Sequence, residues 1–231
     1  MRRQAALILL GATALAVIVF LAFPDLDLMV ARHLLRPDGH FILHWVMPFL
    51  TIHFWVPAPV IACLGFFGLI AAADLLGRPI LGLTRWHALY VAAVFAIGPG
   101  LLANTLLKDH SGRPRPQAVQ EFGGSMPYAP PFSFNGACST NCSFVSGDAA
   151  AVFAFIGPAL LLPPGRRKVG IAAVLLLGSA IGLMRMLQGG HFLSDVIFAG
   201  LLVTATAISL HWAMFRPDGE PRRPMAREIR M

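Results

Sequence analysis

The chain has 231 residues, of which 57% are hydrophobic and only 13% are charged. Soluble domains carry about a quarter charged residues, so this composition indicates a membrane protein and excludes an ordinary soluble fold. The formal net charge of +7 comes mostly from arginine. It favours cytoplasmic loops and contacts with anionic lipid over nucleic-acid binding, for which the sequence offers no soluble basic face.

Six apolar segments are long enough to cross a bilayer core, which takes about 20 helical residues. The predicted spans are residues 5–23, 54–75, 87–107, 144–163, 169–187 and 194–214. Prolines inside several of them indicate kinks and not helix ends. For the first segment, a cleaved signal peptide is the alternative, although no convincing small-x-small site follows it. We expect an all-α integral membrane protein, with residues 1–231 forming a single domain of six bundled transmembrane helices.

The segment between the first two spans, residues 25–52, mixes aspartate and arginine with leucine, methionine and tryptophan. That density of charge forbids a membrane span. Amphipathic helices lying at the membrane interface fit the pattern better, and we expect them here.

Arginine and lysine residues gather in the connections on one side of the predicted bundle. They are Arg2, Arg3, Arg78, Arg85, Arg166, Arg167 and Lys168, followed by the arginines of residues 216–231. The positive-inside rule makes this side cytoplasmic. Both termini are then expected in the cytoplasm, with 216–231 as a basic tail. Residues 25–52, the loop 108–143 and the connection "QGGH" would face the periplasm of a bacterial inner membrane.

Two of the three cysteines, Cys138 and Cys142, lie four residues apart in a loop rich in glycine, serine and asparagine. In an oxidising compartment they can form a disulfide, although tight geometry can also forbid it, and both alternatives stay open. Cys63 lies in an apolar run and is read as a small buried hydrophobe. No histidine or cysteine pair has zinc-site spacing near this loop, so we expect no metal site.

Three polar segments meet at the predicted periplasmic face: "KDHSGRPRP" (108–116), "VSGD" (145–148) and "MRMLQGGHFLSD" (184–195). Cationic donors suited to phosphate oxygens are Lys108, Arg113, Arg115 and Arg185. Ser146 and Gly147 precede an apolar run, so their backbone amides should lie near a helix N-terminus, where an anion is stabilised.

His191 and Asp195 lie four residues apart at the start of the last predicted span, on one face of the helix. A carboxylate there can fix the imidazole tautomer and leave the other ring nitrogen free to attack. Each of these groups alone has an ordinary explanation, as a surface charge, an interfacial histidine or a helix cap. Their convergence at one face predicts a site for phosphoryl transfer.

These motifs resemble the type-2 phosphatidic acid phosphatase family over residues 87–214. The family pattern Lys-x6-Arg-Pro matches Lys108 through Arg115-Pro116 in full. The pattern Ser-Arg-x5-His-x3-Asp matches Arg185, His191 and Asp195, with Met184 in place of the serine.

The resemblance implies that His191 attacks phosphorus and forms a phosphohistidine, with Asp195 orienting the ring. Lys108, Arg115, Arg185 and the Ser146-Gly147 amides would stabilise the transferred group, without metal or cofactor.

Asp148 departs from the family pattern, because it stands where the family motif Pro-Ser-Gly-His has its histidine. That histidine protonates the leaving oxygen. Three interpretations stay open: Asp148 is itself an acid–base group, the leaving group is good enough to need less help, or the chain has lost catalysis and keeps lipid binding.

The resulting hypothesis is a metal-independent phosphatase of a lipid phosphate monoester or diphosphate at the periplasmic face. Lipid A 1-phosphate is the favoured substrate. The alternatives are an undecaprenyl-diphosphate or phosphatidylglycerophosphate phosphatase, a lipid phosphotransferase, and a non-catalytic lipid-binding or transport protein.

Overall fold

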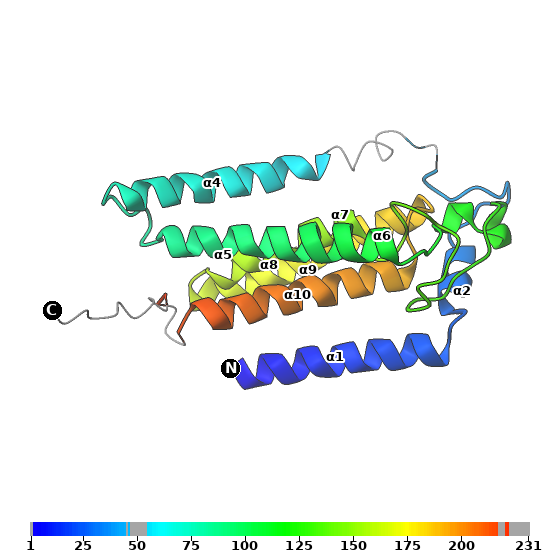
Figure 1. Cartoon of the computed structure of the whole chain (residues 1–231), viewed down its shortest axis with the longest axis horizontal. Helices are drawn as coiled ribbons and strands as arrows, with labels where there is room; N and C mark the ends of the chain where they lie inside the picture. Colours follow the sequence, from blue (N-terminus) through cyan, green and yellow to red (C-terminus); the bar gives the residue numbers. More distant parts are fainter. Residues whose placement is uncertain (1, 45, 47–54, 217–219, 222–231) are drawn as a thin grey trace.

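The computed structural model describes residues 2–44, 46, 55–216, 220 and 221. The regular secondary structure of these residues is helical, with isolated β-bridges but no strand, which confirms the predicted all-α class. Within this described part of the chain, five helices are long and apolar enough to cross a membrane. They are α1 (Arg2–Ala22), α4 (Pro57–Leu75), a continuous helix over Arg85–His110, α9 (Pro164–Leu187) and α10 (Leu193–Met214), and they lie side by side in Figure 1.

The helix Arg85–His110 changes its winding along its length. It begins as α5 (Arg85–Phe95), continues as the π-helical segment η2 (Ala96–Leu107) and ends as α6 (Lys108–His110). Pro99 lies inside η2. A proline has no N–H to donate, and its ring clashes with the carbonyl four residues earlier in a regular α-helix. The wider winding accommodates Pro99 without ending the helix, as the sequence predicted.

The fourth predicted span, residues 144–163, is not one long helix. It consists of α7 (Gly147–Phe153) and α8 (Ile156–Leu160), which pack against α9 and α10. Pro158 cannot donate to the carbonyl of Ala154, which accepts instead from the N–H of Gly157 at 2.9 Å. The predicted six spans are therefore five long helices and this shorter, broken segment.

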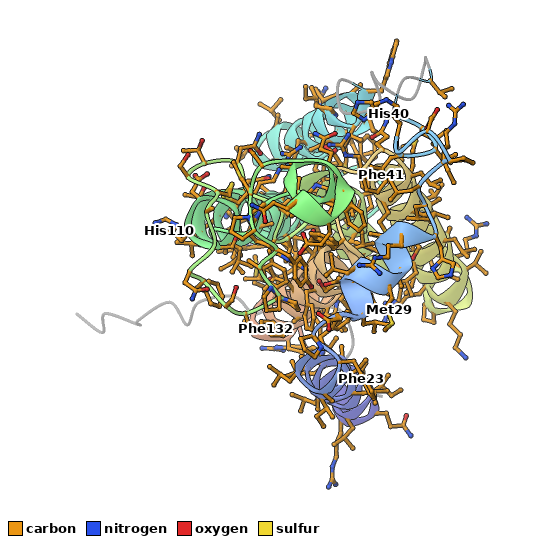
Figure 2. The ribbon with its side chains drawn as sticks, turned by 90° about the vertical axis from the view of Figure 1, so that its right-hand side faces the viewer. Phe23, Met29, His40, Phe41, His110 and Phe132 are labelled. Carbon is orange, nitrogen blue, oxygen red and sulfur yellow. A yellow bond between two sulfur atoms is a disulfide. The ribbon has the colours of Figure 1, made fainter. Side chains whose placement is uncertain are left out.

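One end of the bundle is covered by α2 (Leu26–Arg32) and by a long loop with two short turns, η3 (Pro116–Ala118) and η4 (Gln120–Phe122) (Figures 1 and 2). The same end carries α6, the start of α7 and the α9–α10 connection. Helix α1 begins, and α10 ends, at the opposite end. The three motif segments therefore meet at one end of the molecule.

The predicted interfacial segment 25–52 is described only in part, because residues 45 and 47–52 lie outside the described residues, as does most of the predicted tail 216–231. Its first helix, α2, is docked on the protein. Leu28 and Ala31 pack against Phe41, Val119 and Phe192.

Candidate active site

Backbone hydrogen bonds join the first motif segment to the residues that directly precede the second one. The N–H groups of Cys142 and Ser143 donate to the carbonyls of Lys108 and Arg113 at 3.0 and 2.8 Å. Gly112 has a φ of +64°, and a Cβ atom there would lie 2.8 Å from the carbonyl oxygen of Gly136. Only glycine combines this backbone conformation with so close an approach.

A disulfide joins Cys138 and Cys142. Of the two alternatives that the sequence left open, the structure therefore has the bonded pair. The turn it closes contains Asn141, whose side-chain and backbone oxygens accept hydrogen bonds from Nη2 of Arg115 at 2.9 and 3.1 Å. Burial and the nearby Arg185 guanidinium lower the pKa of Arg115. A cation with a like charge beside it favours an anion between the two.

The second motif begins helix α7, with Ser146 as the residue before its first turn. A Cβ atom on Gly147 would lie 3.0 Å from Nζ of Lys108 and would collide with Asn104. Glycine therefore lets the backbone of α7 approach the Lys108 ammonium. The Oγ atom of Ser146 is buried and has no hydrogen-bond partner among the described residues. Such orphaned buried hydroxyls are uncommon in folded proteins.

Arg185, in the last turn of α9, faces Asp148 in the first turn of α7. Its Nε atom lies 3.0 Å from Oδ2 of Asp148, and Nη1 donates to Oε1 of Gln188 at 2.6 Å. The Nε contact is an ion pair without hydrogen-bond alignment, because Nε has no hydrogen-bond partner within the described part of the chain. The carboxylate that replaces the family histidine is thus paired with a predicted phosphate-binding arginine.

His191 is buried between α9 and α10, with 2% of its surface exposed. Its Nδ1 atom lies 2.8 Å from the carbonyl oxygen of Ser143 and 3.5 Å from Oδ2 of Asp195. A carbonyl can only accept, so Nδ1 carries the proton and Nε2 keeps the lone pair in the neutral ring. Burial lowers the pKa of His191, although Asp195 opposes the shift. The neutral, nucleophilic form is therefore favoured.

The sequence predicted that Asp195 fixes the tautomer of the ring, and its Oδ2 does lie 3.5 Å from Nδ1, with the Ser143 carbonyl as the nearer acceptor. Asp195 holds that same residue, because its Oδ2 accepts from the Ser143 hydroxyl and from the Phe192 N–H. Asp195 is fully buried. It is therefore linked to the imidazole both directly, by the 3.5 Å approach of Oδ2 to Nδ1, and through Ser143.

Arg113, which the sequence grouped with the phosphate-binding cations, points into the protein and is 1% exposed. Its guanidinium donates to protein acceptors: the Ala129 carbonyl at 2.9 Å, Ser194 Oγ at 2.7 Å, and one oxygen each of Asp195 and Asp27 at 2.6 Å. These bonds leave it little capacity for a substrate.

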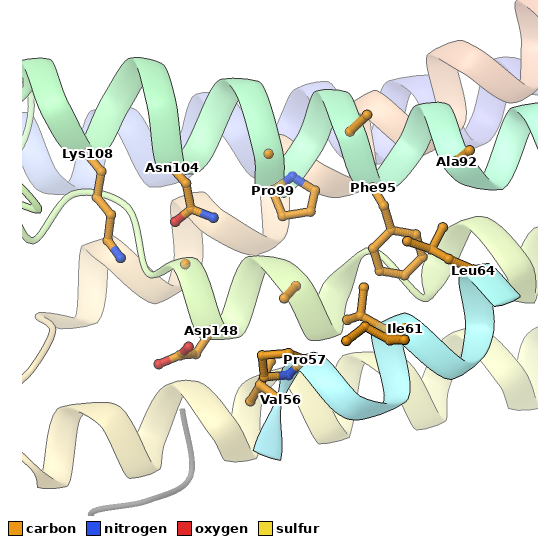
Figure 3. Close-up of a pocket in the computed structure, with 15 residues that line it drawn as sticks. Val56, Pro57, Ile61, Leu64, Ala92, Phe95, Pro99, Asn104, Lys108 and Asp148 are labelled. Carbon is orange, nitrogen blue, oxygen red and sulfur yellow. The ribbon is translucent and has the colours of Figure 1, made fainter. Parts of the chain in front are cut away.

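A groove of about 470 Å³ runs from this site between α4, η2 and α7 (Figure 3). Lys108, Asn104 and Asp148 lie at one end of it. The rest of its lining is apolar and includes Ile61, Leu64, Phe95, Pro99 and Ala151. Among the described residues, no group of three or more His, Cys, Asp or Glu side chains is arranged to hold a metal ion.

The model of the PAP2 superfamily matches residues 87–218, more than half of the chain. The chain belongs to the PAP2 superfamily. This confirms the predicted type-2 phosphatidic acid phosphatase family and a lipid phosphatase enzyme.

Curated PAP2 relatives include a lipid A 4'-phosphatase of Francisella tularensis subsp. novicida (strain U112). It is 38% identical over 218 residues, covering 86% of this chain and 90% of the relative. A lipid A 4'-phosphatase of Rhizobium leguminosarum is 39% identical over 117 residues, covering 49% of this chain and 50% of the relative. A lipid A 1-phosphatase of Rhizobium johnstonii is 37% identical over 153 residues, covering 60% of this chain and 58% of the relative. No solved structure matches significantly.

Two residues near the PAP2 motifs were missed by the sequence analysis. Asn104 lies four residues before Lys108, a spacing that places both on one helix face and that was visible in the sequence. Asp27 contacts Arg113 from helix α2, 86 positions away. No spacing rule connects such distant residues, and Asp27 appeared only as an interfacial charge.

Proposed function

We propose that this PAP2 protein hydrolyses a phosphate monoester of lipid A at the periplasmic face of the inner membrane, through a phosphohistidine on His191. The observation that carries the proposal is the setting of the His191 ring. The Ser143 carbonyl holds its Nδ1–H, so that Nε2 has the lone pair. The relatives named lipid A phosphatases support the choice of lipid.

In this mechanism Nε2 of His191 attacks phosphorus while the bond from phosphorus to the lipid oxygen breaks. Lys108, Arg115 and Arg185 stabilise the charge on the phosphoryl oxygens, together with the orphaned hydroxyl of Ser146. A water molecule then attacks the phosphohistidine, and the N–P bond breaks to release inorganic phosphate.

Asp148 is the candidate proton carrier in both steps. Once Arg185 has left it, the carboxylate takes up a proton from solvent or from the monoanionic substrate phosphate and passes it to the leaving lipid oxygen, directly or through water; in the second step it takes a proton from the attacking water. When a phosphate binds Arg185, that arginine is drawn away from the carboxylate that it contacts at 3.0 Å in the empty site. In this proposal, phosphate binding to Arg185 is thus coupled to the release of the Asp148 carboxylate from that arginine.

The apolar groove supports a lipid substrate. Its polar end contains Lys108 and Asp148, and most of its apolar lining comes from α4 and the helix Arg85–His110, which are candidate membrane spans. A lipid whose phosphate binds at Lys108 can lay an acyl chain along Leu64 and Phe95 (Figure 3).

We favour the 4'-phosphate of lipid A, because the Francisella relative that covers 86% of this chain is a 4'-phosphatase. The 1-phosphate is the second candidate. Asp148 in place of the family histidine favours it, since a hemiacetal oxygen is a better leaving group than the secondary alcohol at position 4' and needs less proton donation.

The decisive experiment uses purified protein and bis-phosphorylated lipid A, with the products analysed by mass and by phosphorus NMR. We expect loss of one phosphate, the NMR spectrum identifying which one, and no release by His191→Ala. Undecaprenyl diphosphate and phosphatidylglycerophosphate serve as competing substrates. Equal release by wild type and His191→Ala from every lipid would rule out the phosphohistidine. Transfer of phosphate to a second lipid, instead of to water, would reassign the protein as a phosphotransferase.

The periplasmic location is tested separately with reporter fusions. A reporter active only in the periplasm, inserted at exposed Gly123 in the loop 108–143, should be active. Activity of a cytoplasmic reporter at the same position would overturn the proposed orientation.

A further inference from the structure

Asp27 lies on α2, outside residues 87–218 that match the PAP2 model, yet it reaches the vicinity of the active site. The side chain is fully buried. Its Oδ2 accepts from Nη2 of Arg113 at 2.6 Å and from the Ser194 hydroxyl, and its Oδ1 accepts from the Ser194 N–H at 2.9 Å. Burial raises the pKa of Asp27, and Arg113 is the main influence that opposes the shift.

The Arg113 guanidinium joins two carboxylates from distant parts of the chain. Nη2 binds Asp27, and Nη1 binds Asp195 at 2.6 Å. The guanidinium carbon also lies 4.4 Å from the centre of the Phe192 ring. A planar guanidinium with its donors engaged on several sides has one allowed orientation. The position of Asp27 therefore constrains the Arg113 nitrogen that holds Asp195.

Asp195 passes this constraint to the nucleophile. It accepts a hydrogen bond from the Ser143 hydroxyl, and the Ser143 carbonyl accepts from Nδ1 of His191 at 2.8 Å. The groups between Asp27 and the imidazole are thus linked by consecutive short hydrogen bonds, and each of them is buried.

We propose that Asp27 is a positioning residue for phosphoryl transfer, acting through Arg113 and Asp195 on the orientation of the His191 ring. This inference rests on the proposed function. It makes α2, a seven-residue helix outside the matched family domain, part of what sets the rate of the chemical step.

The proposal differs from a purely structural role in what it predicts for kinetics. Asp27 does not contact Lys108, Arg115 or Arg185, so phosphate binding should survive its loss. Misorienting the attacking nitrogen by a fraction of an ångström slows the chemistry. A structural role would instead lower the amount of folded protein and change phosphate binding and turnover together.

The test compares Asp27→Asn with Asp25→Asn in the purified full-length protein. Asp25 is exposed, lies two residues away and has no side-chain capping bond, so it is a matched control. We expect Asp27→Asn to lower kcat by about 10- to 100-fold. KM for the lipid, and the inhibition constant of inorganic phosphate, should stay within about twofold of wild type. Asp25→Asn should match wild type throughout.

Ser194→Ala is the second variant, because it removes the hydroxyl that bridges Asp27 and Arg113 but keeps the backbone donor. We expect a fall in kcat of about fivefold, the size of one ordinary hydrogen bond. If Asp27→Asn does not fold, kcat of Ser194→Ala decides whether Asp27 is a positioning residue.

Unchanged kcat in a folded Asp27→Asn protein overturns the inference, as does a parallel rise in the phosphate inhibition constant. If only Ser194→Ala folds, wild-type kcat in that variant has the same meaning. In each of these outcomes wild type still hydrolyses lipid phosphate. A wild-type protein without hydrolase activity would instead overturn the proposed function.

Discussion

Asp148 and Arg185 form an ion pair across the gap between α7 and α9, with Oδ2 and Nε 3.0 Å apart. Both side chains are partly exposed, at 22% and 13%. One cation of the candidate phosphate site is therefore matched by a carboxylate of the protein until an anion arrives. In the proposed mechanism a substrate phosphate competes with that carboxylate for Arg185, so Asp148 would affect both binding and proton transfer.

Asp148→Asn separates these two effects. Removing the charge should lower the inhibition constant of inorganic phosphate several-fold, because Arg185 loses its internal partner. Loss of the proton donor should lower kcat by about 10²–10⁴-fold for a poor leaving group and by much less for a good one. Kinetics on lipid A carrying only the 4'- or only the 1-phosphate provides the comparison.

Asp148→His restores the family residue and serves as the control for this pair. It should recover turnover on the poorer leaving group. If Asp148→Asn and Asp148→His both match wild type on both substrates, Asp148 has no acid–base role.

The acid limb of the pH profile should report His191. Burial lowers the pKa of His191 from its ordinary value of 6.5. The neutral nucleophile then persists below pH 6.5, and kcat/KM should fall only as the pH drops past the lowered pKa. Asp195→Asn removes the charge that opposes the shift and should move the acid limb to still lower pH.

The phosphate monoester itself titrates near pH 6. All variants share that contribution, so the difference between Asp195→Asn and wild type on one substrate isolates the imidazole. An acid limb that moves upward in Asp195→Asn would contradict the proposed environment of His191.

The disulfide should matter for phosphate affinity. Replacing Cys138 and Cys142 by serine frees the turn that presents Asn141 to Arg115. We expect the inhibition constant of inorganic phosphate to rise about 3- to 10-fold, consistent with loss of a charged hydrogen bond. Asn141→Ala should reproduce the effect, and Cys63→Ser should leave phosphate binding unchanged. Full affinity in the double serine variant would show that Arg115 is positioned without the bridge.

Gly147→Ala tests the close approach of α7 to Lys108. The added methyl group would lie 3.0 Å from Nζ of Lys108 and would displace Asn104. We expect kcat/KM to fall about 10- to 100-fold. The protein should stay folded, because alanine is the better helix former. Gly165→Ala in α9 is the control, since no atom lies within 4 Å of its added Cβ. Equal activity of both variants would remove this contact from the account of the site.

The sequence predicted the long helices well, because apolar length alone decides whether a segment can span a bilayer. It predicted the broken segment 144–163 poorly. Summed hydropathy does not register that Pro158 lacks the N–H that would bond the Ala154 carbonyl, at the break between α7 and α8. The family motifs were recognisable because their spacing is local along the chain.

The motif spacings could not predict how the side chains are oriented. Arg113 and Arg115 are two residues apart in one loop, yet one guanidinium is 1% exposed and paired with buried carboxylates while the other reaches Asn141. Asp27 is one of the buried partners that hold Arg113, and its contact with the loop forms only when α2 docks on it. Tertiary contacts of this range leave no pattern in a single sequence.

The groove in Figure 3 gives the two products of the proposed reaction different exits. Freed phosphate is soluble and leaves toward water from the end at Lys108. The dephosphorylated lipid withdraws along the apolar walls into the bilayer. Inhibition by phosphate then depends on its concentration in solution. Inhibition by the dephosphorylated lipid depends instead on its density in the membrane. Diluting the lipid with inert phospholipid should therefore relieve inhibition by the lipid product and leave inhibition by phosphate unchanged, whatever the volume of the assay.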